Sequence, residues 1–171
     1  MVGRIGGMGR MKIAGPLMAV LALGLAACSP QPAAEATPAA AAEERHPTSN
    51  LRIVPVTVRS GSETRLFRTE VANSPEAQAR GLMFRTELPD DEAMLFPRDE
   101  IAIASFWMKN TPIPLDIIFI GTDRKIINIA AMTTPYSLDP VLSDGPVGAV
   151  LEIRGGLAEE LGIEPGDTVQ W

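Results

Sequence analysis

The sequence predicts a mainly β fold over residues 51–171: a compact, single-domain β-barrel or sandwich of about seven strands with two short helices. After residue 50 the chain changes to short β-branched and apolar runs separated by turn residues, a pattern typical of strands. The apolar run 115–120 is followed by a Gly-Thr-Asp-Arg turn and a second apolar run, which indicates a hairpin in the core. The length of the segment suits one domain that folds without a metal or a disulfide.

Each strand is expected where an apolar run is bounded by turn residues. In chain order the strands are predicted at residues 52–59, 64–71, 104–109, 115–121, 125–132, 147–153 and 167–171. The first helix is predicted to begin at Pro75, behind a capping serine or asparagine, and to end near Gly81. The second helix is expected at 157–161, where Gly162 ends it.

Residues 1–27 have the layout of a lipoprotein signal peptide. Basic residues precede a short apolar run at 13–25, and the Leu-Ala-Ala-Cys sequence that follows resembles the lipobox of bacterial lipoproteins. The alternatives are a plain secretory signal and an uncleaved anchor, but the run is shorter than the roughly 20 residues of a membrane-spanning helix. We expect Cys28 to be lipidated and to anchor the protein in the cell envelope, on a bacterial membrane facing the periplasm. Ser29 after the cysteine favours the outer membrane.

The segment 28–50 is predicted to consist of the lipidated cysteine and a disordered linker. It is rich in Ala, Pro and Glu and has neither helical nor strand periodicity, so it buries too little apolar surface to become ordered. We expect it to act as a tether that holds the β domain away from the lipid.

Composition excludes several classes of function. The chain has a formal net charge of −6 and no cluster of basic residues, so nucleic acid is not an expected partner. Cys28 and His46 are the single cysteine and the single histidine, and both precede the β domain. The domain therefore has no ligands for a zinc or copper site and no Ser-His-Asp or Cys-His centre. Composition leaves open an oxygen-ligand Ca²⁺ or Mg²⁺ site, but a solvated turn explains the Asp139–Asp144 loop better, and we expect no cofactor and no metal.

The most suggestive cluster for function is the run Ser-Phe-Trp-Met-Lys-Asn at 105–110. Strand alternation places Trp107 and Lys109 on one face and Asn110 on the other. A lysine bordered by aromatic residues could act as a base or bind an anionic ligand. The plainer interpretation is that the Lys109 stem packs on Trp107 while its ammonium group reaches water or a carboxylate.

Two further charged residues are candidates for the same site. Asp116 lies inside the most apolar run, so its carboxylate must be paired or hydrogen-bonded, and Lys109 and Arg85 are the natural partners. Arg85 follows the first predicted helix and could clamp a carboxylate or phosphate, or simply pair with Glu87 or Asp90.

Three stretches of the chain resemble one bacterial and archaeal family. They are NSPEAQARGLMFRTE at 73–87, SFWMKNTPIPLDIIFI at 105–120, and the part of 147–169 that contains VLEI and GIEPGDTV. They are similar to the domain of unknown function 192, also called uncharacterised protein family 0127, over about residues 54–171. The resemblance implies a mainly β fold and an envelope location, without an agreed reaction, cofactor or catalytic residue.

Together these features favour a noncatalytic, lipid-anchored module of the cell envelope. We expect it to bind a small molecule, a peptide or a partner protein through a cleft near Trp107, Lys109 and Arg85. The alternative is an envelope enzyme that uses Lys109 with Asp116 or with a serine.

Overall fold

The computed structural model describes residues 43–171. The predictions for the signal peptide 1–27, for Cys28 and for the linker up to residue 42 lie outside the described residues. Within the part of the chain that is described, no helix is both long enough and apolar enough to cross a membrane.

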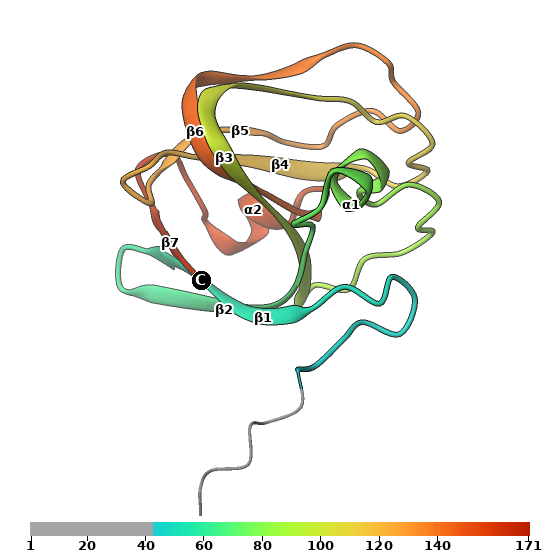
Figure 1. Cartoon of the computed structure of the whole chain (residues 1–171). Helices are drawn as coiled ribbons and strands as arrows, with labels where there is room; N and C mark the ends of the chain where they lie inside the picture. The colour runs from blue at the N-terminus through green and yellow to red at the C-terminus, as the bar shows by residue number, and fades with distance from the viewer. Residues whose placement is uncertain (1–42) are drawn as a thin grey trace, which may run out of the picture. The chain divides into compact units, whose positions relative to one another are not determined.

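The β domain consists of one seven-stranded sheet and two short helices, which confirms the predicted fold class (Figure 1). The strands are β1 (Ile53–Ser60), β2 (Glu63–Val71), β3 (Glu92–Phe106), β4 (Leu115–Ile120), β5 (Ile126–Ala130), β6 (Val141–Arg154) and β7 (Thr168–Gln170). The helices are α1 (Pro75–Arg80) and α2 (Leu157–Leu161). The strand order is β5-β4-β6-β3-β2-β1-β7, with β2 and β3 parallel and the other neighbours antiparallel.

A single curled sheet, rather than two packed sheets, forms the domain, so of the two predicted architectures the barrel describes it better. Main-chain hydrogen bonds join its two edges. The amide of Ile126 donates to Asp167 at 2.9 Å, and the amide of Val169 donates to Arg124 at 2.8 Å. These bonds link the start of β5 to β7 and give the sheet the curvature of a half-barrel.

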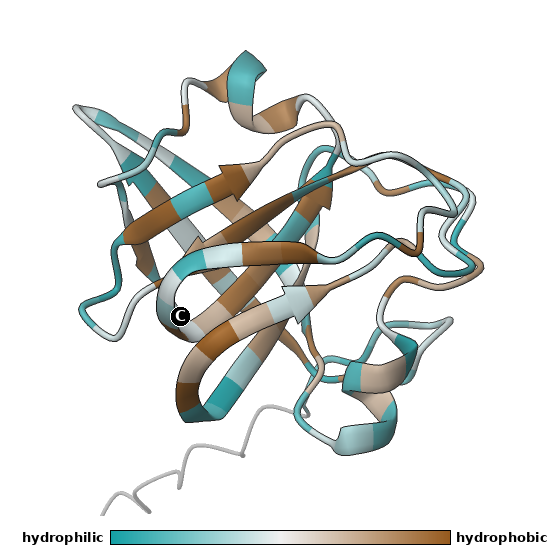
Figure 2. Ribbon diagram, turned by 90° about the horizontal axis from the view of Figure 1, so that it is seen from above, coloured by the Kyte–Doolittle hydropathy of each residue, from teal (hydrophilic) through white to brown (hydrophobic). Residues whose placement is uncertain are grey.

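The core lies on both faces of the sheet. The strand β4 illustrates this, because all six of its residues are buried. Leu115, Ile117 and Phe119 belong to one apolar cluster, and Ile118 and Ile120 belong to the other. Apolar residues on successive positions thus belong to opposite faces, as pleating requires, and both faces of β4 are buried. Figure 2 shows the hydrophobic residues concentrated along the strands.

The strands β3 and β6 are longer than predicted. The sequence placed strands at 104–109 and 147–153, whereas β3 covers Glu92–Phe106 and β6 covers Val141–Arg154. Their pairing shifts register between Pro97 and Ala102, where Pro-Arg-Asp-Glu interrupts the apolar alternation that sequence analysis depends on. Residues 107–109 do not continue β3, because the chain turns there and the Met108 amide donates to Ser137.

Residues 43–50, predicted as part of the disordered linker, are ordered against the β domain. A bridge pairs Arg45 with Arg52, and the amide of Ile53 donates to Glu44 at 2.8 Å. His46 is 8% exposed, and its ring nitrogens lie 3.7 Å from Glu70 and 3.8 Å from Glu92. These contacts depend on carboxylates that are distant in sequence, and the local composition does not reveal them.

Candidate ligand-binding site

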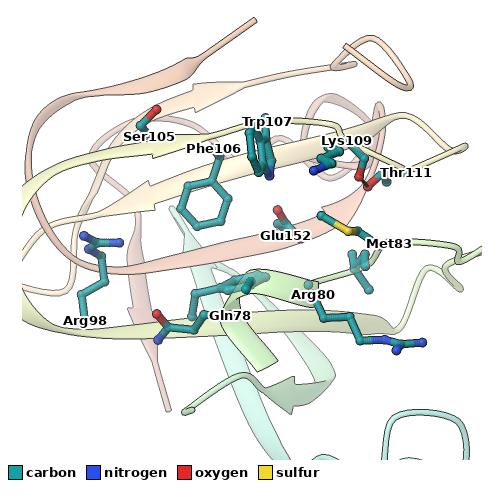
Figure 3. Close-up of a pocket in the computed structure, with 14 residues that line it drawn as sticks. Gln78, Arg80, Met83, Arg98, Ser105, Phe106, Trp107, Lys109, Thr111 and Glu152 are labelled. Carbon is teal, nitrogen blue, oxygen red and sulfur yellow. Dashed lines mark hydrogen bonds between the residues drawn. The ribbon is translucent and has the colours of Figure 1, made fainter. Parts of the chain in front are cut away.

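A cavity of about 300 Å³ opens between α1, β3 and β6 (Figure 3). Its lining combines apolar, cationic and polar side chains from segments far apart in the sequence. The lining residues are Gln78, Ala79, Arg80, Gly81, Leu82, Met83, Phe96, Arg98, Ser105, Phe106, Trp107, Lys109, Thr111 and Glu152. A concave site with mixed walls of this kind is typical of small-molecule binding.

The helix α1 forms one wall because the local sequence defines both of its ends. The Ser74 hydroxyl accepts a hydrogen bond from the Ala77 amide at 3.2 Å, and Pro75 occupies the first turn. Gly81 ends the helix at φ 48° and ψ −136°, a conformation that suits glycine. A Cβ atom on Gly81 would lie 3.4 Å from the Phe96 ring, an ordinary contact distance, so the requirement for glycine comes from the backbone conformation.

Glu152 on β6 is the buried acid of the cavity. It is 5% exposed, and no hydrogen bond or ion pair joins its carboxyl group to another of residues 43–171. Burial removes the water that would stabilise the charged form and raises the pKa of Glu152 to about 8. At neutral pH this carboxyl group is therefore mostly protonated and can donate a hydrogen bond into the cavity.

Aromatic side chains form the apolar wall. The Phe106 ring packs edge-on against Phe96, with centroids 5.2 Å apart, and against the fully buried Phe119, with centroids 6.1 Å apart. Phe106 is thereby fixed by the core. Trp107, the next residue, is 52% exposed and offers a broad apolar surface at the cavity.

Three cations line the same cavity: Arg80, Arg98 and Lys109. The Lys109 ammonium lies 5.1 Å from the centroid of the Trp107 ring, a cation–π arrangement. The Nε atom of Arg98 is buried and has no hydrogen-bond partner within the described chain. None of the three cations forms an ion pair with a carboxylate of residues 43–171.

A second hollow of about 250 Å³ adjoins the first. Ser105, Phe106 and Trp107 line both, and Leu138 and Pro140 complete the second. Leu138 is strongly exposed. The apolar surface around Trp107 therefore extends beyond the first cavity.

Asp116 lies outside the cavity lining and has a structural role, which corrects the predicted pairing with Lys109 or Arg85. It is fully buried, and its carboxylate accepts hydrogen bonds from the amides of Met132 at 2.8 Å, Gly156 at 2.9 Å and Ala158 at 2.8 Å. Gly156 precedes α2 and has no side chain to cap it. Asp116 therefore supplies the cap from β4 and satisfies amides that the helix leaves free.

Arg85 and Asn110 also lie outside the cavity lining. The Arg85 guanidinium bonds both carboxylate oxygens of Glu70, at 2.8 and 2.9 Å, rather than the predicted Glu87 or Asp90. Asn110 adopts a positive φ of 55° in a turn, and its carbonyl accepts the Phe84 amide at 2.8 Å. Of the five predicted ligand-binding residues, the structure thus brings Trp107 and Lys109 together at the cavity.

Comparison with known families identifies the domain. The model of the family DUF192, described as "Uncharacterized ACR", matches residues 56–171. The chain belongs to the DUF192 family. This confirms the resemblance seen in the sequence. No match was found among curated proteins.

Two solved structures are similar to this DUF192 chain. A protein of unknown function from Novosphingobium aromaticivorans DSM 12444 is 57% identical, with a TM-score of 0.74, and the match covers 77% of this chain and 94% of that one. A proposed transcription regulator from Sinorhizobium meliloti 1021 is 35% identical, with a TM-score of 0.68, and the match covers 70% of this chain and 94% of that one.

The residues predicted for the site of this DUF192 domain did not include Glu152, Arg80 or Arg98. A signal for Glu152 existed, because it lies in the apolar run Val-Leu-Glu-Ile, and an acid inside such a run requires the same explanation as Asp116. The two arginines lie in polar stretches where nothing local distinguishes them from surface residues.

Proposed function

We propose that this protein is a noncatalytic binding module of the bacterial cell envelope, tethered by lipid on Cys28, whose β domain takes up a small organic molecule. The cavity beside Trp107 is the single observation that carries the proposal. Its volume of about 300 Å³ is at the lower end of the range for small-molecule sites, which starts near 300 Å³. Its aromatic wall offers apolar contact, while Glu152 and the cations offer polar contacts that would orient a ligand.

The location is proposed from the sequence. The basic residues, the apolar run and the Leu-Ala-Ala-Cys lipobox support cleavage before Cys28 and anchoring by lipid. Metabolic labelling with a fatty-acid probe tests this step. Wild-type protein should be labelled and Cys28→Ser should not, and equal labelling of the two proteins would contradict the anchor.

The contacts of Asp116 favour binding over catalysis. Both of its oxygens are engaged by main-chain amides, so an enzyme that pairs Lys109 with Asp116 is not supported. Ser105 and Lys109 both line the cavity, but no hydrogen bond joins them within the described residues. A serine nucleophile activated by this lysine would need such a bond or a close approach to it.

Nucleic acid is not part of the proposal. One similar structure belongs to a proposed transcription regulator, but this chain has a net charge of −6. Binding to a phosphate backbone depends on several basic contacts along one surface.

Calorimetric titration of the full chain, purified from bacterial membranes in mild detergent, tests the binding function. Three probes share one naphthalene body and differ in their head groups: 2-naphthoate, 2-naphthamide and 2-naphthylmethylammonium. At least one should bind in a 1:1 ratio, and Trp107→Ala should weaken that binding by about tenfold, because it removes the exposed aromatic wall.

Leu66→Ala is the matched control. Leu66 is 63% exposed on β2 and is not part of the cavity lining, so its removal should leave binding unchanged. Thermal unfolding of both variants shows whether each retains the fold. Absence of saturable binding for all three probes would overturn the proposed function.

A further inference from the structure

Glu152 is a buried acid whose hydrogen-bond partner is not supplied by the described part of the fold. Buried polar groups in proteins are almost always hydrogen-bonded, and an unpaired carboxyl group costs stability. Asp116, a fully buried acid on the neighbouring strand β4, follows the rule with three amide donors. Glu152 is 5% exposed, lines the cavity, and has no such partner among residues 43–171.

The chemistry of the cavity restricts what could satisfy Glu152. A ligand could offer either an ammonium group, which needs the ionised carboxylate, or an acceptor oxygen, which needs the protonated acid. In the folded protein the carboxyl group holds its proton at neutral pH, because burial disfavours the charge. It is therefore ready to donate to an acceptor oxygen.

The cations that line the cavity also favour a ligand with an acceptor oxygen over one with an ammonium group. Arg80, Arg98 and Lys109 line it, and none of them forms an ion pair with a carboxylate of the described chain. A cluster of unpaired cations in an acidic protein attracts an anion. A ligand ammonium group would instead be repelled by it.

We propose that the ligand is an organic carboxylate with a flat apolar body, whose body lies against Phe106 and Trp107, and whose carboxylate faces Lys109 and accepts a hydrogen bond from Glu152. This inference rests on the proposed function of the cavity. Figure 3 shows the arrangement: the Glu152 carboxyl group lies between the Trp107–Lys109 side and the Arg80 side of the lining. The burial of Glu152 and the charge of the lining cations thus both favour a carboxylate ligand.

Titration of the three naphthalene probes into the full chain at pH 7 tests whether the ligand is a carboxylate. Naphthoate should bind about tenfold more tightly than 2-naphthylmethylammonium, and more tightly than naphthamide, because it alone gains charge-assisted hydrogen bonds to the cations. Lys109→Met should weaken naphthoate binding by about tenfold and leave naphthamide binding nearly unchanged.

Lys125→Met is the matched control, since Lys125 is an exposed lysine outside the cavity lining and its loss changes the net charge equally. Glu152→Gln should retain naphthoate binding within about threefold, because the amide still donates, while Glu152→Leu should lose it about tenfold. Thermal unfolding identifies variants that fail to fold. If Glu152→Leu does not fold, the comparison of Glu152→Gln with wild type tests the role of Glu152.

The outcomes separate the two proposals. If none of the probes binds, the binding function and the ligand class both fail. If the ammonium or the amide binds as tightly as naphthoate, or if Glu152→Gln abolishes naphthoate binding, the function stands and the ligand class is wrong. An equal loss in Lys125→Met and Lys109→Met would also overturn the inference, because the effect would then reflect net charge alone.

Discussion

Replacing Glu152 by Gln should change how the stability of the domain depends on pH. Burial raises the pKa of Glu152 from its ordinary value of 4.5 to about 8 in the folded state. Between these two values the folded protein keeps a proton that the unfolded chain has lost. The free energy of unfolding of the wild type therefore falls as pH rises through this window, and the neutral glutamine removes this contribution.

The expected size follows from the two pKa values. The cost of keeping Glu152 protonated is about 1 kcal/mol at pH 5 and about 4 kcal/mol at pH 8. The stability of Glu152→Gln relative to wild type should thus increase by about 3 kcal/mol between pH 5 and pH 8. Any pH-independent cost of burying the amide cancels in this comparison.

Guanidinium unfolding of both proteins, as chains spanning residues 43–171, measures the effect at pH 5, 6, 7 and 8. With a slope of about 3 kcal/mol/M, the difference between the two midpoints should grow by about 1 M across this range. A difference between the two proteins that stays constant with pH would refute the reasoning, because Glu152 would then ionise in the folded domain as it does in water.

Three further predictions concern stability. Asp116→Asn should lower the free energy of unfolding in guanidinium by about 2–4 kcal/mol and leave naphthoate binding intact. The reason is that the asparagine NH₂ group would face a main-chain amide that now donates to the carboxylate. Unchanged stability would contradict the capping role. Gly81→Ala should lower the thermal midpoint, at a cost of about 1–3 kcal/mol, because alanine disfavours φ 48° with ψ −136°; a variant as stable as wild type would show that the turn relaxes. A chain spanning residues 51–171 should be about 1–3 kcal/mol less stable than one spanning 43–171, because it loses His46 beside Glu70, and equal midpoints would mean that these contacts contribute nothing.

Local sequence patterns were sufficient to predict part of the cavity lining. Trp107 and Lys109 could be recognised because an aromatic residue and one of the few lysines stand two positions apart, and the structure places both at the cavity. Asp116 is buried, as the sequence predicted, but the predicted pairing with Lys109 or Arg85 was wrong. A sequence shows that a carboxylate needs partners without showing which ones, and main-chain amides leave no trace in the residue types.

By itself the sequence determined the family, the mainly β class, the number of strands and the ends of α1, because each depends on neighbours within a few residues. The lengths of β3 and β6 were decided only by tertiary structure, since pairing between them carries both strands across the bulge near Pro97. The same pairing places Glu152 opposite Met94 and beside the cavity, more than forty residues from Lys109 in the chain. Burial and charge at that cavity depend on segments that only the folded sheet brings together. The apolar run around Glu152 shows that the acid is buried, but only the structure shows that it faces a cavity lined by cations.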